Sequence, residues 1–418
     1  MNSITSDFAP PLKLIAPFFK YGVIFYLLSM MALLFFEPTF SYQQMDVAGW
    51  VHLFLLGFVM MIIFGAMAQL IPVVLESGHV VVDVYYVILP LLGIGAVVMV
   101  AGFWLMPAIL PYGGLLVLIG MLIFAAENIA TLKKTKIRTL TVDTVAWSNG
   151  YLLLGILTGF TIALGLSGDL GIDVSLMLKA HVYTVLGGYV ILTIIGLSLI
   201  LIPMFSLAHG FDETAINRAF KLVITGVGIV FMGALIAQEW LMMIGYVINT
   251  IGIFFYMWQI YIIAKLTVRK EVDVWAKSMI FAFIALILAI LLGLLYFITD
   301  RESMLHASVW FILLGFISSF ITGHLYKIVP FLVWFERFAP LVGKEKVPML
   351  HEMYSKEGAN LMFLFTVSGV MLGGFGLLFE SDMLFKAGGS FLFTGAIFLY
   401  ITMKKMLAYG SEELRIKN

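Results

Sequence analysis

The chain has 418 residues, of which 62% are apolar and 11% charged, and its mean hydropathy is +1.08. A composition this poor in charge excludes a soluble globular domain and indicates a polytopic membrane protein. The 24 basic residues balance the 24 acidic ones, which argues against a nucleic-acid partner, and the absence of cysteine excludes disulfides, thiolate metal sites and iron–sulfur clusters.

Apolar runs long enough to cross about 30 Å of hydrocarbon occur twelve times along the chain. Their length and the lack of alternating polarity favour helices over barrel strands. The sequence therefore predicts an all-α polytopic membrane protein, a single transmembrane domain over 1–418 embedded in a lipid bilayer. The expected spans are 14–36, 47–75, 82–104, 109–132, 144–166, 175–205, 216–237, 241–267, 276–298, 303–333, 358–379 and 384–407.

Basic residues are concentrated in alternate connections between the spans. They follow the fourth, sixth, eighth and tenth spans and close the chain, whereas the other connections hold mainly acids. Only Lys179, Arg301 and Lys386 are basic on the acidic side. By the positive-inside rule we expect both termini to be cytoplasmic, in the inner membrane of a bacterium.

One sequence frame recurs in the second, sixth and tenth spans. The segments 57–72, 188–203 and 315–330 each read Gly-aromatic, then Gly eight residues later and Pro seven residues after that, and no other proline has both glycines. Small residues on one helix face allow close packing, which is our first interpretation of these glycines. The frame predicts three pseudo-repeated four-helix units, at roughly 14–132, 144–267 and 276–407.

Three histidines accompany this frame, one in the outer part of each marked span: His52, His181 and His306. Each imidazole could form a hydrogen bond across helices, or take part in a proton relay. A neutral imidazole on a rigid helix beside an apolar, Gly-rich slot is also suited to axial ligation of haem. Copper held by histidines alone would need two or three converging rings.

The other histidines are expected outside the membrane or at its edge. His79, His209 and His351 fall in loops predicted to be cytoplasmic, and His324 lies near the same end of the tenth span, so we expect solvated or interfacial rings. Glu127, near the end of the fourth span, is the main acidic candidate for proton uptake, and an interfacial position is the simpler interpretation.

Twelve spans in three four-helix units, with histidines at the outer ends of the second, sixth and tenth, resemble the catalytic subunit of haem–copper oxidases. "HASVWFILLGF", starting at His306, resembles the tenth-span segment of that family. The family's second tenth-span histidine is replaced here by Ser308 or Met304, and its seventh-span pair of copper histidines is absent. The residue near His181 is Tyr183, so the redox tyrosine of the family is not matched either.

The start of the second span is also similar to the NnrS family, haem- and copper-containing membrane proteins linked to nitric oxide tolerance. The similarity rests on Trp50, His52, Gly57, Gly65 and Pro72 and on their spacing. The additional histidine pairs of that family are not reproduced. The order and number of the spans resemble these families along the whole chain, but few of the families' sequence motifs are present.

The resemblance implies one haem b, or two, and argues against copper, which would lack ligands. His52 and His306 would ligate a haem between the second and tenth spans. Alternatively, His181 and His306 would bracket one between the sixth and tenth. The haem propionates would need outer cations, and the outer cations are Lys386, Arg301 and Lys179, which could equally be surface residues.

The expected function follows from the ligation. A bis-histidine haem would transfer electrons, whereas a five-coordinate haem would bind nitric oxide or dioxygen; an enzyme of this type would be an oxidoreductase. Partners would be a quinol or a cytochrome c, a small gas ligand, and a second copy in a homo-oligomer. The alternatives are a haem-free transporter and a structural subunit of a respiratory complex.

Overall fold

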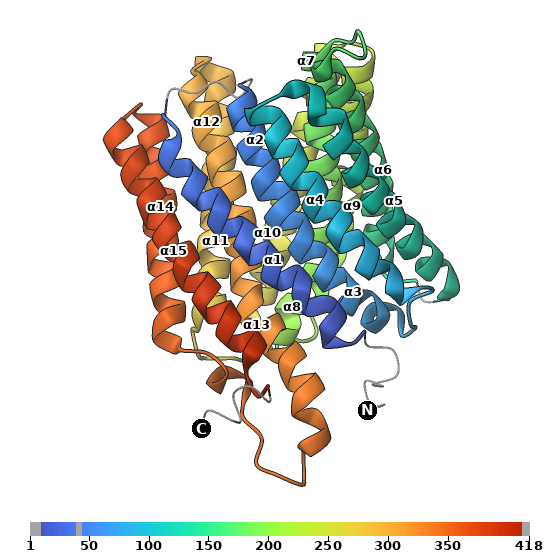
Figure 1. Ribbon diagram of the computed structural model, residues 1–418, viewed down its shortest axis with the longest axis vertical. Helices are drawn as coiled ribbons and strands as arrows, with labels where there is room; N and C mark the ends of the chain where they lie inside the picture. Colours follow the sequence, from blue (N-terminus) through green and yellow to red (C-terminus); the bar gives the residue numbers. More distant parts are fainter. Residues whose placement is uncertain (1–9, 39–43, 137, 412–418) are drawn as a thin grey trace. The chain divides into compact units, whose positions relative to one another are not determined.

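A computed structural model of the chain describes residues 10–38, 44–136 and 138–411. It confirms the prediction of an all-α polytopic membrane protein: twelve helices are long and apolar enough to span a membrane, and the described residues contain no strand (Figure 1). The spans are α1–η1 (Leu12–Phe35), α2–η2–α3 (Met45–Leu75), η3–α4 (Val82–Trp104), η4–α5 (Pro107–Lys134), α6 (Leu140–Ser167), α7–η5–α8 (Val174–Ser206), α9 (Thr214–Leu235), α10 (Glu239–Lys265), α11 (Val274–Thr299), α12–η6–α13 (Glu302–Arg337), α14 (Lys356–Leu378) and α15 (Asp382–Ala408).

Capping side chains and a left-handed glycine mark the ends of several helices. The carboxylates of Asp173 and Asp273 cap α7 and α11 by accepting backbone N–H groups of Leu176 and Ala276. Gly168 ends α6 in the left-handed conformation that glycine adopts without a Cβ penalty. Between these ends, apolar side chains face the hydrocarbon while each helix satisfies its own backbone groups.

The chain forms two compact units that do not follow the order of the sequence. Unit 1 comprises Met67–Glu271, and so holds the end of the second span and the third to eighth spans. Unit 2 comprises Pro11–Ala66 and Val272–Asn418, and so holds the first span, most of the second and the last four.

The three marked spans share a feature that we did not predict, a π-helical segment around the first glycine of the frame. The three segments are η2 (Leu55–Met60), η5 (Tyr183–Ile191) and η6 (Phe311–Ile317). They contain Gly57, Gly188 and Gly315 respectively. A π segment adds a residue to a helical turn, redirects the side chains around it, and is frequent at functional sites. The frame is therefore a repeat of local backbone geometry as well as of sequence.

In unit 2, the frame glycines of the second span pack against phenylalanine side chains of the first span. A Cβ on Gly57 would lie 2.5 Å from Cγ of Phe25, and one on Gly65 would lie 2.7 Å from Cβ of Phe18. The two phenylalanines are seven residues apart, which is two helical turns. These glycines therefore serve close helix packing, as our first interpretation held.

The other two marked spans pack in the same way. The glycine pairs of the sixth and tenth spans receive side chains from the preceding span, α6 in unit 1 and α11 in unit 2. The residues whose side chains contact these glycines are again seven apart in each case: Tyr151 and Thr144 on α6, and Ala285 and Ser278 on α11. The sequence repeat is thus also a repeat of packing between a marked span and the span before it.

The last two spans of each predicted repeat form hairpins with closely packed backbones. A Cβ on Gly113 of α5 would lie 2.6 Å from the backbone nitrogen of Met99 on α4. Gly245 of α10 packs likewise on Val230 of α9 in unit 1. In unit 2, α14 and α15 form the red pair of Figure 1, and they meet through their backbones at a glycine of each helix.

We expect Gly57→Ala to lower the free energy of unfolding by about 1–3 kcal/mol, because the added methyl group overlaps the Phe25 ring inside a packed interface. Gly150→Ala is the control: this exposed glycine of α6 has no atom within 4 Å of an added Cβ, so the higher helix propensity of alanine should make the variant as stable as the parent or more so. Denaturant unfolding of the detergent-solubilised chain measures both. Equal stabilities of the two variants would contradict the packing role.

Candidate functional site

The three predicted histidines all lie on the short α-helix that precedes a π segment. His52 is on α2 (Met45–Phe54), His181 on α7 (Val174–Val182) and His306 on α12 (Glu302–Trp310). His52 and His306 belong to unit 2, whereas His181 belongs to unit 1.

His52 is held by its own helix. Its Nδ1 lies 2.7 Å from the carbonyl oxygen of Ala48, one turn earlier, so Nδ1 carries the proton and donates it. In this tautomer Nε2 carries the lone pair, which is the state that a metal-ligating histidine needs. The half-buried ring has aromatic neighbours along the helix, where Trp50 and Phe54 stack at 5.8 Å, and Trp50 donates a hydrogen bond to the carbonyl oxygen of Ser29.

His181 packs between helices instead. Its Nδ1 lies 2.9 Å from the carbonyl oxygen of Gly155 on α6. The ring rests against Gly159, where a Cβ would lie 2.7 Å from Cε1 of the histidine. This arrangement matches the interpretation of a histidine that is hydrogen-bonded across helices.

His306 is half-buried on α12, whose position is set by two hydrogen bonds to neighbouring helices. Ser308 donates to the carbonyl oxygen of Ala289 on α11 at 2.8 Å, and the indole of Trp310 donates to that of Val370 on α14 at 2.9 Å. Ser308, which takes the place of a histidine in the oxidase-like pattern, therefore has a structural hydrogen bond.

The three outer cations predicted for haem propionates lie on the surface of their units. Lys386 pairs with Asp382 at 2.9 Å, one turn earlier on α15, and both side chains are about half exposed. Lys179 lies 3.7 Å from Glu239 in unit 1. Arg301 is exposed at the residue before α12. Two of the three cations thus already have acidic neighbours.

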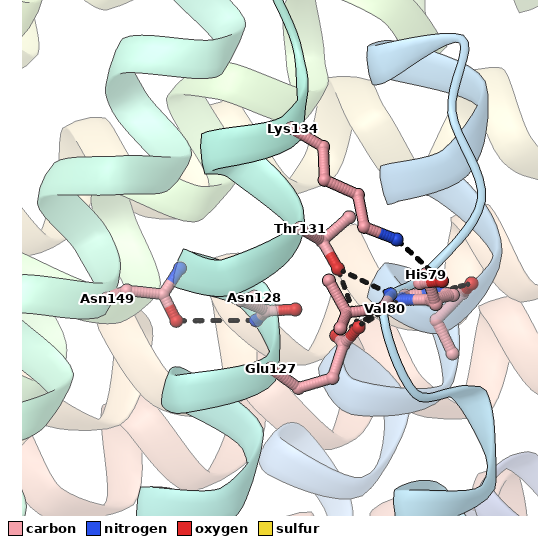
Figure 2. Close-up of polar contacts among 8 residues, drawn as sticks. His79, Val80, Glu127, Asn128, Thr131, Lys134 and Asn149 are labelled. Atoms are coloured by element: carbon pink, nitrogen blue, oxygen red, sulfur yellow. Dashed lines mark hydrogen bonds and ion pairs between the residues drawn. The ribbon is translucent and has the colours of Figure 1, made fainter.

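A buried ion pair in unit 1 corrects the prediction of a solvated His79. The side chain of His79 is only 2% exposed and that of Glu127, on α5, only 3%. Nδ1 of His79 lies 3.0 Å from both carboxylate oxygens, and Nε2 lies 2.7 Å from the carbonyl oxygen of Ala68 (Figure 2). The Ala68 carbonyl can only accept, so Nε2 donates to it, and the contact of Nδ1 with both oxygens fits an imidazolium paired with a carboxylate.

The carbonyl oxygen of Ala68 is available because of Pro72. A proline inside a helix lacks the N–H that would bond the carbonyl four residues earlier, and Pro72 lies four residues after Ala68 in α3 (Met61–Leu75). His79 supplies the missing donor from the following loop. The spacing of Ala68 and Pro72 is therefore a sequence signal for an unpaired carbonyl oxygen in α3. It does not show that His79 is the residue that donates to this oxygen.

Glu127 completes the cluster from the other side. Its Oε1 accepts the hydroxyl of Thr131 at 2.6 Å and the backbone N–H of Val80 at 3.1 Å, as Figure 2 shows. Lys134 contacts the carbonyl oxygen of His79 at 3.4 Å. The pair therefore ties the loop after the second span to the fourth span. The burial of Glu127 is compensated by this hydrogen-bonded partner.

A second buried charge pair lies in unit 2. Nζ of Lys327 on α13 (Ser318–Arg337) lies 2.5 Å from Asp273, and each side chain is 12% exposed. His324 is buried one turn earlier with Nδ1 2.8 Å from the carbonyl oxygen of Phe320, so its ring is not solvated. The indole of Trp275 lies edge-on to the His324 ring and beneath the ammonium group of Lys327.

Within the described part of the chain, no three His, Asp or Glu side chains are grouped so that they could hold a metal ion. A haem iron needs only one or two axial imidazoles, and His52 has the tautomer for that role. In comparisons with known proteins, no family model and no curated protein matches the sequence.

Proposed function

We propose that the protein is a haem-binding integral membrane protein, with a haem b held by His52 and His306 in unit 2. The observation that carries the proposal is the hydrogen bond from Nδ1 of His52 to Ala48, which leaves the lone pair of the neutral ring on Nε2. His306 belongs to the same unit and to an equivalent helix, directly before a π segment as His52 is.

The residues that would hold the group are already oriented. The Ala48 carbonyl fixes the ring of His52, while Ser308 and Trp310 anchor the helix that carries His306 to α11 and α14. The frame glycines are filled by side chains of the preceding spans, so they position the helices that carry the histidines. When bound, haem supplies reversible one-electron chemistry or, with one axial position open, binding of a small gas.

The proposed role is electron transfer within the inner membrane of a bacterium, or the handling of nitric oxide or dioxygen, with quinol or a cytochrome c as electron partner. Both termini would be cytoplasmic, supported by the alternation of basic and acidic connections. The ring of His181 packs closely against Gly159 of α6, which favours ligation by His52 over ligation by His181.

The test is an absorption spectrum of the purified chain, oxidised and dithionite-reduced, with and without nitric oxide. We expect a Soret band in both oxidation states and sharp low-spin bands on reduction, which nitric oxide leaves unchanged if both axial positions are filled by histidine. Bands that shift with nitric oxide would assign the gas-binding role instead. A protein that carries no Soret band after expression with ample haem would exclude the proposal and favour a haem-free transporter or structural subunit.

A further inference from the structure

The fourth and eighth spans, both in unit 1, carry the same pattern with one chemical difference. Two glycines seven residues apart are followed after seven more by a buried polar side chain, which is Glu127 on α5 and Gln259 on α10. The glycines, Gly113 with Gly120 and Gly245 with Gly252, pack each helix against the one before it. The acid and the amide therefore occupy equivalent places in two equivalent hairpins.

Gln259 performs the same structural task as Glu127 without a charge. Its Oε1 accepts the backbone N–H of Ile216 at 3.2 Å, and its amide group donates to the carbonyl oxygen of Asp212 at 2.8 Å. Glu127 likewise accepts a backbone N–H, that of Val80, from the segment that precedes the third span. A neutral amide is thus sufficient to hold such a segment against the helix.

A charge at Glu127 is consequently not needed to hold the segment before the third span against α5. Burying that charge without a partner would be costly. In the imidazolium–carboxylate state, charge-assisted hydrogen bonds join Glu127 to Nδ1 of His79 and to the backbone N–H of Val80, which also bonds the hydroxyl of Thr131 at 3.1 Å. A proton added to Glu127 or lost from His79 removes one charge of the pair and so weakens these bonds.

We propose that His79 and Glu127 form a proton-exchange site that couples attachment of the loop 76–81 to the proton concentration on its side of the membrane. The pair lies directly beneath exposed residues of the loop side, where Val80 is 41% exposed and the exposed Lys134 contacts the carbonyl oxygen of His79. The titratable groups that face the pair are Tyr85 of α4, edge-on to the imidazole, and Lys134 of α5. Helix α3 contributes none, and α6 contributes the neutral amide of Asn149, bonded to Asn128 beside Glu127 (Figure 2).

Hydrogen exchange in the full-length chain tests this with an internal control. The Val80 amide bonds an ionisable acceptor, Glu127, together with the hydroxyl of Thr131, whereas the Ile216 amide bonds a neutral acceptor. Exchange is followed by mass spectrometry between neutral and acidic pH on peptides that isolate these two amides, and corrected for intrinsic exchange rates. We expect the protection of Val80 to fall about tenfold or more in acid, as a charge-assisted hydrogen bond is lost. The protection of Ile216 should stay constant.

Glu127→Gln supplies the matched variant, since it installs the side chain that the eighth span already uses. In this protein the protection of Val80 should become as independent of pH as that of Ile216. The proposal is overturned if Val80 and Ile216 follow the same pH course in the wild-type chain, or if Glu127→Gln leaves the pH course of Val80 unchanged. The wild-type comparison decides alone if the variant does not fold.

Discussion

Replacing His79 by alanine is expected to lower the free energy of unfolding by about 3–5 kcal/mol. The change leaves the Glu127 carboxylate buried without its cation and removes the donor to the Ala68 carbonyl that Pro72 exposes. Most surface substitutions change stability by less than about 0.5 kcal/mol, so the effect should be easily resolved. Denaturant titration of the detergent-solubilised chain, followed by far-ultraviolet circular dichroism, measures it.

The matched control is His209→Ala, which changes the same residue type in the exposed loop after the sixth span. We expect this variant to unfold with the parent. Glu127→Ala should be about as destabilising as His79→Ala, and the double variant should lose less than the sum, since no unpaired charge remains. Strict additivity of the two single changes would show that the side chains do not interact.

His52→Ala should abolish haem binding if His52 and His306 are the axial ligands, and His306→Ala should do the same. His181→Ala should keep the full haem content, because its ring is committed to packing and hydrogen bonding against α6. The Soret absorbance per mole of purified protein, compared between the three variants and the parent, measures the outcome. Size-exclusion chromatography confirms that each variant remains folded.

The pattern across the three variants separates the possible ligand pairs. Loss of haem from His181→Ala with retention in His52→Ala would assign the axial positions to His181 and His306. Full haem content in His52→Ala and in His306→Ala would exclude both pairs. A ligand-deficient cavity can be filled by imidazole, so restoration of the spectrum of His52→Ala by added imidazole would show that the site itself survives the substitution.

Local properties of the sequence were sufficient for the architecture. Each span needs only enough consecutive apolar residues to cross the bilayer, which hydropathy reports directly, and the expected boundaries lie within a few residues of those observed. The Gly-Gly-Pro frame was also visible, because a repeat is a property of spacing. The π segments were not, because the shift from one helical hydrogen-bond register to another depends on the neighbours that each turn meets.

The polar contacts depended on long-range geometry. His79 and Glu127 are 48 residues apart, and topology alone placed the first in solvent and the second at an interface. His79 bonds the Ala68 carbonyl oxygen that Pro72 leaves without an N–H partner, and the loop that carries His79 lies against Glu127 of α5. These groups come together only when the helices are packed.

Hydropathy and spacing were enough to identify the twelve spans, their repeat and the three histidines that accompany it, since both are properties of single helices. The tertiary structure decided which side chain fills each glycine notch, which histidine is bound to a neighbouring helix, and which charges meet inside unit 1. A buried charge or a missing Cβ is stable only opposite a complementary group, and the packing of separate helices supplies that group.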